Sequence, residues 1–201
     1  MAGYRSSRII PTALVLIIVI LAIAALVSLT RLVFFPDDQS TDSRADTSHQ
    51  ELINTAVDHS VKMTIRGPIV AEEDFHSYQI VVSPLSRTLT TYVGYINKKV
   101  DEVVLDNNVP AYEEFVYALD RASLAKGAEL SGDDNDTRGI CAIGRVYEFE
   151  VLKADVSIKK LWTTTCGSSA KGSLVANLDQ LASLFTKQIP GGALTISRLH
   201  L

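Results

Sequence analysis

The chain has 201 residues, 47% of them hydrophobic, and a formal net charge of −4 at pH 7. All twenty-three Asp and Glu residues but only sixteen of the nineteen Lys and Arg residues lie in residues 36–201, so that part carries a charge of −7. An acidic surface without a cluster of basic and aromatic residues argues against nucleic acid as a partner.

Residues 9–29 form an uncharged apolar run of twenty-one residues. As a helix, such a run is about 31 Å long, enough to cross a hydrocarbon core of about 30 Å. Arg5 and Arg8 precede it and Asp37 and Asp38 follow it, which favours a cytoplasmic N-terminus. A cleaved signal peptide is the alternative, but its apolar region is typically only about 7–15 residues long. We therefore expect a retained membrane anchor.

The anchor determines the predicted layout of the chain, which is that of a single-pass protein of the cell membrane. The segment PDDQSTDSRADTS that follows the anchor is polar and rich in Asp and Ser, which is typical of a flexible tether. Four parts are predicted: a cytoplasmic N-terminus (1–8), a transmembrane signal anchor in contact with the lipid bilayer (9–35), the tether (36–48) and an extracytoplasmic domain (49–201).

The first half of the domain has the pattern of β-strands. Val61, Met63 and Ile65 alternate with polar residues, which predicts a strand that ends at Gly67-Pro68. SYQIVV and RTLTTYVGY are rich in β-branched and aromatic residues, and Pro84 suits the second position of a turn between them.

Two amphipathic helices are predicted, Pro110–Ala122 and Ser173–Gln188, and each has one apolar stripe. The stripes consist of Tyr112, Phe115, Val116 and Leu119 in the first helix and Leu174, Leu178, Leu181 and Phe185 in the second. The final segment ALTISRLHL alternates weakly, so we expect an edge strand or a frayed end there. The predicted class is α+β: a small antiparallel sheet of at least four strands with both helices packed on one face.

Cys141 and Cys166 flank a predicted hairpin. A turn at LKAD (152–155) would pair Phe149 with Ile158 on an apolar face and Glu148 with Lys159 on a polar face. The same register places Cys141 opposite Cys166, at a separation that a disulfide can span. Because the exterior of the cell is oxidising, we expect a structural disulfide between them.

Two other roles for the cysteines are weaker. The four histidines are scattered without ligand spacing, so no metal and no cofactor are assigned. Thr165-Cys166 resembles the end of the T-L-x-T-C motif of sortases, in which the cysteine is the nucleophile. That resemblance implies a histidine and an arginine partner, for which the candidates are His76 and Arg198. Thr163 stands where the motif has Leu, and a helical pattern follows Cys166. We therefore assign no catalytic residue and do not expect an enzyme.

The order of elements between Tyr78 and Cys166 (strands, a helix, then a disulfide-closed hairpin) resembles that of secreted subtilisin-inhibitor-like domains. The resemblance implies inhibition of a protease. The reactive loop of those inhibitors follows a Cys-Pro start, whereas this chain has Cys141-Ala142-Ile143.

The segment AKGAELSGDDNDTRG is the longest predicted loop. Its acidic residues do not have the spacing of an EF-hand, so a solvated acidic loop is expected. Loops commonly carry binding residues on a rigid scaffold, and two candidate binding segments follow: the acidic loop, through Asp133, Asp134, Asp136 and Arg138, and the Ser83–Ser86 turn. The expected function is non-catalytic binding of an envelope or extracellular protein; the alternatives are an inhibitor-like domain and a sortase-like transpeptidase.

Overall fold

The computed structural model describes residues 48–167, 172–199 and 201. Among these residues, no helix has the length and apolar character needed to cross a bilayer. The predicted anchor (9–35) and residues 36–47 of the predicted tether lie outside the described residues.

The described part of the chain is built on a six-stranded antiparallel sheet with the strand order β4-β3-β2-β1-β5-β6. The central strand β1 pairs with β2 on one side and with β5 on the other. The strands are β1 (His59–Arg66), β2 (His76–Val82), β3 (Ser86–Val93), β4 (Lys98–Asp106), β5 (Val146–Lys153) and β6 (Val156–Thr164).

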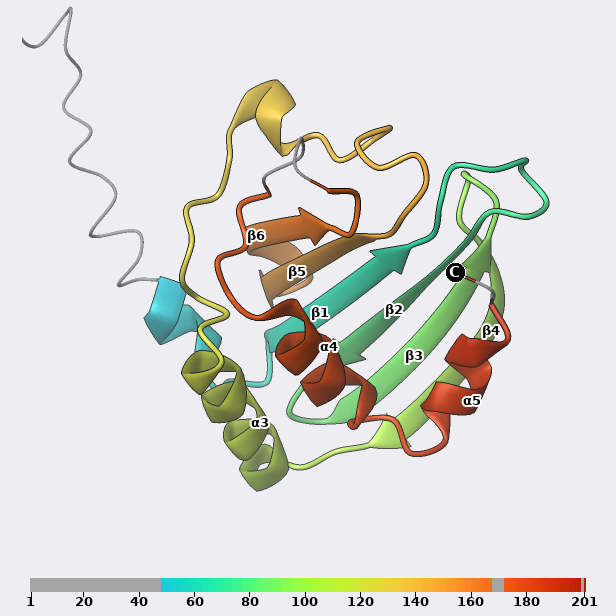
Figure 1. The fold of residues 1–201 in the computed structure, drawn as a ribbon. Helices are drawn as coiled ribbons and strands as arrows, with labels where there is room; N and C mark the ends of the chain where they lie inside the picture. Colours follow the sequence, from blue (N-terminus) through green and yellow to red (C-terminus); the bar gives the residue numbers. More distant parts are fainter. Residues whose placement is uncertain (1–47, 168–171, 200) are drawn as a thin grey trace, which may run out of the picture. The chain divides into compact units, whose positions relative to one another are not determined.

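Three helices cover one face of this sheet, as Figure 1 shows. They are α3 (Val109–Arg121), α4 (Leu178–Thr186) and α5 (Gly192–Ser197), and a short 3₁₀ helix, η1 (Gly132–Asn135), lies in the connection between α3 and β5. The side chain of Asn108 caps α3 and that of Asn177 caps α4, because each oxygen accepts a hydrogen bond from a backbone N–H of the first turn.

The hydrophobic core lies between the sheet and these helices. Alternate residues of β1 (Val61, Met63 and Ile65) point toward the helices and are buried. In register with Met63, Ile80 lies on β2 and Phe149 on β5. The predicted stripe of α3 is buried in full, whereas in the second predicted stripe Leu181 and Phe185 are buried and Leu174 and Leu178 are partly buried. The α+β class with an antiparallel sheet and helices is therefore confirmed.

Three elements differ from the prediction. Strand β4 was not predicted, because KKVDEVVLD is an exposed and charged edge strand whose alternation is broken by a bulge opposite Thr91 and Tyr92. The second predicted helix begins at Leu178 instead of Ser173, because Asn177 provides the cap. The C-terminal segment forms α5 instead of an edge strand, since Ile196 and Leu199, three residues apart, pack on the core.

The two ends of the sheet are built differently. At one end, here called the turn end, the hairpin turns Ser83–Ser86 and 154–155 lie near the start of β1. At the other end, here called the loop end, lie three longer connections: 67–75 between β1 and β2, 94–97 between β3 and β4, and the last part of 122–145 before β5. In Figure 1 the first two of these connections lie side by side beyond the tip of β1.

Candidate functional site

A disulfide between Cys141 and Cys166 fixes the loop end. Their Cα atoms are 5.5 Å apart, as a disulfide requires. Gly144 passes close to this bond, because a Cβ there would lie 3.0 Å from the sulfur of Cys141 and 2.5 Å from Oγ1 of Thr165. The backbone of Thr165 also donates to the carbonyl of Arg145. The predicted disulfide is present, and it joins the loop before β5 to the end of β6.

The predicted register of the β5–β6 hairpin is wrong. Phe149 pairs with Leu161 instead of Ile158, and Glu148 pairs with Trp162 instead of Lys159. The turn consists of Ala154 and Asp155, both with positive φ (48° and 64°), and a bulge follows Val151. For the pairs from Val146↔Thr164 to Val151↔Lys159 the register is shifted by three residues, which moves these β6 side chains to the other face relative to β5. Trp162 is therefore buried on the face away from the helices, and Ile158, expected in the core, is the unpaired residue of the bulge and is exposed.

A buried charge cluster attaches the long α3–β5 connection to the sheet. One oxygen of Glu148 accepts hydrogen bonds from Arg66 Nη2 (3.1 Å) and from the hydroxyl of Thr137, and Lys160 Nζ lies 3.3 Å from it. Burial alone would raise the pKa of Glu148, but the Thr137 hydrogen bond and the charges of Arg66 and Lys160 outweigh burial and hold the pKa below its ordinary value. Arg66 Nη2 also donates to the carbonyl and hydroxyl oxygens of Thr137.

Aromatic residues join the other two loops of the loop end. Tyr95, in the β3–β4 tip, stacks on Phe75 with ring centroids 4.1 Å apart. The hydroxyl of Tyr95 donates to the carbonyl of Val70 (2.7 Å) and accepts from its N–H (3.1 Å). Ile69 donates from its backbone to the carbonyl of Ala142 (2.9 Å). The connection 67–75 is therefore in direct contact with each of the other two loops.

Apolar side chains project from these joined loops into solvent. Ile143 is 91% exposed and Ile96 is 83% exposed. We call the set Ile69, Val70, Tyr95, Ile96 and Ile143 the loop-end surface. Single exposed apolar residues are common on soluble proteins, but five on connected loops at one end of a sheet make this end a candidate interaction site.

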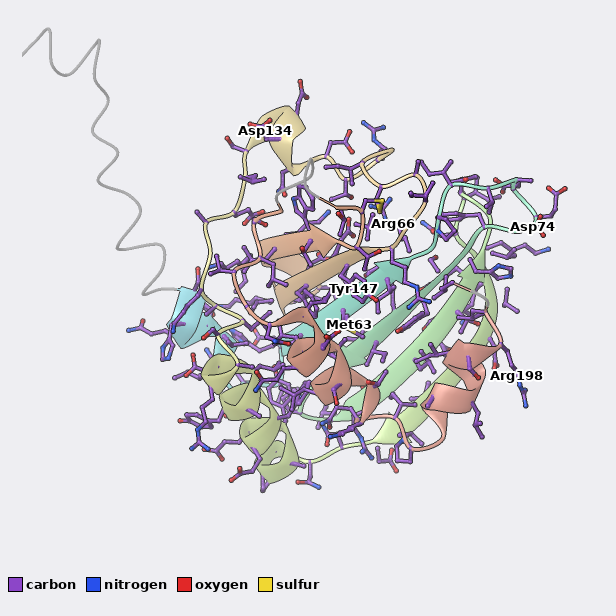
Figure 2. The ribbon with its side chains drawn as sticks, viewed as in Figure 1. Met63, Arg66, Asp74, Asp134, Tyr147 and Arg198 are labelled. Atoms are coloured by element: carbon purple, nitrogen blue, oxygen red, sulfur yellow. A yellow bond between two sulfur atoms is a disulfide. The ribbon has the colours of Figure 1, made fainter. Side chains whose placement is uncertain are left out.

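A cavity of about 100 Å³ opens beside the loop-end surface. Its walls come from all three loops and from the ends of β1 and β5, and they include Arg66, Phe75, Tyr95, Arg138 and Ile140. Figure 2 shows Arg66 near this end of the sheet, with Asp74 on the neighbouring connection. The site therefore combines apolar walls with two guanidinium groups.

The structure brings only part of the predicted acidic-loop site together. Arg138 lines the cavity and pairs with Asp136 (2.5 Å), whose pKa the hydrogen bonds of Arg138 lower to about 2. Asp133 and Asp134 lie in η1 and do not line the cavity; Figure 2 shows Asp134 on the outer part of the loop, away from Arg66. The other predicted segment, Ser83–Ser86, lies at the turn end, so the two candidates do not form one site.

At the turn end, polar side chains are paired with one another or with backbone groups. His59 is 2% exposed, and its ring nitrogens lie 2.7 Å from a carboxylate oxygen of Glu51 and 2.8 Å from one of Asp58. The hydrogen bond from His59 lowers the pKa of Asp58. Asn107 donates from its side chain to the carbonyl of Ser83 (2.6 Å). This end of the domain joins the first described helical turn, residues 48–52, to the sheet.

The residues proposed for other chemistry are not assembled into a centre within the described part of the chain. Residues 48–167, 172–199 and 201 contain no group of three His, Cys, Asp or Glu side chains placed to hold a metal ion. Cys166, which the sortase resemblance requires as a thiol, is bonded to Cys141. Arg198, the arginine of that resemblance, lies next to α5, as Figure 2 shows.

The loop-end surface was not predicted from the sequence. The signal that could have indicated it is the presence of apolar residues where turns usually carry polar ones: Tyr95 and Ile96 follow Gly94 at a hairpin tip, and Ile143 precedes Gly144. Single positions of this kind gain meaning only when the fold places them side by side. The sequence matches no protein-family model and no curated protein.

Proposed function

We propose that this protein is a single-pass, membrane-anchored domain that binds an envelope or extracellular protein through its loop end, without catalysis. The observation that carries the proposal is the loop-end surface: five exposed apolar side chains on three loops that are connected through residues 67–75 and that line one cavity. The disulfide and the Glu148 cluster hold these loops on the sheet. A rigid apolar surface with charged groups at its side is suited to protein recognition.

The position of the loop end supports this proposal. The described chain begins at Ser48, and Glu51 contacts His59 at the start of β1. β1 then runs eight residues to Arg66 at the loop end, a distance of about 26 Å at about 3.3 Å per residue. Ser48 therefore lies near the turn end, at the opposite end of β1 from the loop-end surface.

A second candidate is protease inhibition, and the observation that favours it is the exposure of Ile143. This residue follows the bonded Cys141 by two positions and is 91% exposed, as a loop offered to a protease must be. The test is incubation of the full chain with a serine protease of the subtilisin class. Stoichiometric inhibition that Ile143→Asp abolishes and Val156→Asp does not would favour this candidate over general binding.

Site-specific photocrosslinking tests the main proposal. A photoreactive amino acid at Ile96 or Ile143 of the full chain, in the cells that make it, is expected to give a defined adduct on irradiation. Leu85 and Val156, which are 60% and 65% exposed at the turn end, are matched controls and should give none. Equal adducts at all four positions, or none at Ile96 and Ile143, would contradict the proposal.

Protease treatment of intact cells tests the topology separately. The proposal requires that added protease removes residues 49–201 from intact cells or spheroplasts and that the anchor stays with the membrane fraction. Full protection of the domain, or its release in soluble form without protease, would show that the topology is wrong.

A further inference from the structure

The cavity at the loop end has a mixed lining that limits what it can hold. Ile69, Phe75, Tyr95 and Ile140 supply apolar walls, and Arg66 and Arg138 supply positive charge. A volume of about 100 Å³ admits a small group and not a whole side chain with its backbone. A cavity of this kind binds the polar end of a larger molecule while the remainder lies on the surface outside.

Arg66 has hydrogen-bonding capacity left over. Three of its bonds, to Glu148 and Thr137, use only Nη2. Its Nε is buried and has no hydrogen-bond partner, and its Nη1 donates to no group within residues 48–167, 172–199 and 201. A guanidinium group offers five N–H donors, and unpaired donors of a charged group in a partly buried place are costly. An acceptor that enters the cavity would use them.

The backbone around the cavity also presents donors. The N–H groups of Gly139, Ile140 and Cys141 donate to no acceptor in the described part of the chain, and all three residues line the cavity. Gly139 has a φ of 71° in the left-handed region, and no atom lies within 4 Å of a Cβ built there. The positive φ, and not a lack of space, is therefore what favours glycine at position 139. Successive N–H groups at such a bend are a common arrangement for binding anions.

The charges at the cavity favour a monoanion. Arg66 and Arg138 are the charged residues among those that line it, and each is already paired with one carboxylate, Glu148 and Asp136 respectively. Two guanidinium groups that are each partly neutralised match the single charge of a carboxylate better than the double charge of a phosphate dianion. The apolar walls favour a carboxylate on an aliphatic chain over a hydrated inorganic anion.

We propose that this cavity is a carboxylate subsite of the loop-end surface, which receives a carboxylate of the partner protein while aliphatic atoms beside it pack on Ile140 and Phe75. This proposal rests on the proposed binding function and specifies its ligand chemistry. The carboxylate belongs to a chain terminus or to an acidic side chain, two sources that share the same recognition.

Titration of the isotope-labelled full chain in detergent micelles tests the subsite, with the amide signals of Gly139 and Ile140 and the Nε–H signal of Arg66 as the readout. N-acetyl-leucine represents a chain terminus, N-acetyl-glutamic acid α-amide represents a side-chain carboxylate, and N-acetyl-leucinamide is the uncharged control. The carboxylates should shift these signals in a saturable way, and the stronger of the two identifies the source. No saturable shift, or an equal shift with the uncharged control, would overturn the proposal.

Variants check that the shifts come from the cavity. Arg138→Gln changes an exposed side chain and should weaken carboxylate binding about tenfold, the effect of losing one charged hydrogen bond. Arg121→Gln, an exposed arginine at the end of α3, is the matched control and should leave binding unchanged. Equal binding by Arg138→Gln and the unchanged protein would contradict the subsite. Arg66→Lys is informative only if its spectrum retains the folded dispersion, so Arg138→Gln is the primary variant.

The two proposals fail separately. Crosslinking at Ile143 without any carboxylate-dependent shift would retain the binding surface and reject the subsite. Saturable carboxylate shifts without crosslinking at Ile96 or Ile143 would retain the subsite and reject the proposed binding of a protein partner.

Discussion

The turn end and the loop end of the sheet are made by the same strands, but they differ in how far their polar groups are paired and in how far their most exposed apolar side chains project. At the turn end, the connections are short and polar groups such as His59 and Asn107 are paired. At the loop end, Arg66 keeps unpaired donors and Ile143 projects into solvent. Unpaired donors and exposed apolar groups reduce stability unless something binds them. The comparison thus separates an end that holds the fold from an end available to a partner.

The largest expected effect comes from the disulfide, since it holds the loop end. Replacing Cys141 and Cys166 together by Ser should lower the free energy of unfolding by about 3 kcal/mol, the value of a closed loop of this size. Urea denaturation of the variant and the unchanged protein measures this. The amides of the loop end should lose protection from hydrogen exchange before those of the turn end. Simultaneous loss at both ends would show that the two ends are one cooperative unit.

A smaller effect is expected at the turn end, from His59→Gln. Both ring nitrogens of His59 lie within hydrogen-bond distance of a carboxylate oxygen, 2.7 Å from Glu51 and 2.8 Å from Asp58. Glutamine cannot reach both partners, and the free energy of unfolding should fall by about 2 kcal/mol. His76→Gln at the loop end is the matched control, because His76 bonds only an exposed carbonyl; a change of less than about 0.5 kcal/mol is expected. Equal losses for the two variants would remove the contrast between the ends.

Glu148→Gln tests the electrostatic attachment of the loop end. The pKa of Glu148 is lowered in the folded protein, so its carboxylate stabilises the fold above the pKa of the unfolded chain, and this contribution is lost as pH falls through the folded value. At pH 7 the variant should be about 1 kcal/mol less stable. The difference should shrink as the pH is lowered from about 5 to 3. Denaturation curves across this range measure it, and a difference that grows toward low pH would contradict the assignment.

The contrast between the two ends also explains which features the sequence revealed. The turn at Ser83–Ser86 was predicted because Pro84 interrupts two strands with clear alternation. The β5–β6 register was mispredicted because its turn uses Ala154 and Asp155 at positive φ, without the glycine or asparagine that normally signals such a turn. The disulfide is present although the register used to predict it was wrong, because both cysteines lie outside the paired strands, whose register does not fix the distance between them.

The candidate site was less predictable than the fold, because its contacts join residues far apart in sequence. Arg138 was selected as part of an acidic loop, and it does line the cavity. Its neighbour Arg66 looked like one polar position of an alternating strand. Only the strand order, which places β5 next to β1, brings Arg66 to Glu148 and to the loop that carries Arg138. Local patterns of hydrophobicity do not contain that information.

The smallest expected effect on stability is also the sharpest test of the comparison. Ile96→Ser and Ile143→Ser remove side chains that are 83% and 91% exposed, so the free energy of unfolding should change by less than about 0.5 kcal/mol. When an apolar residue is central to an interface, removal of its side chain commonly weakens the binding free energy of the complex by more than about 1 kcal/mol. The double variant should therefore unfold like the unchanged protein and lose the partner that photocrosslinking identifies. Leu85→Ser, at the turn end, should change neither the free energy of unfolding nor the binding of the partner. If instead Ile96→Ser and Ile143→Ser destabilise the fold as strongly as His59→Gln, these side chains support the fold, and the loop end would no longer differ from the turn end in the way the binding proposal requires.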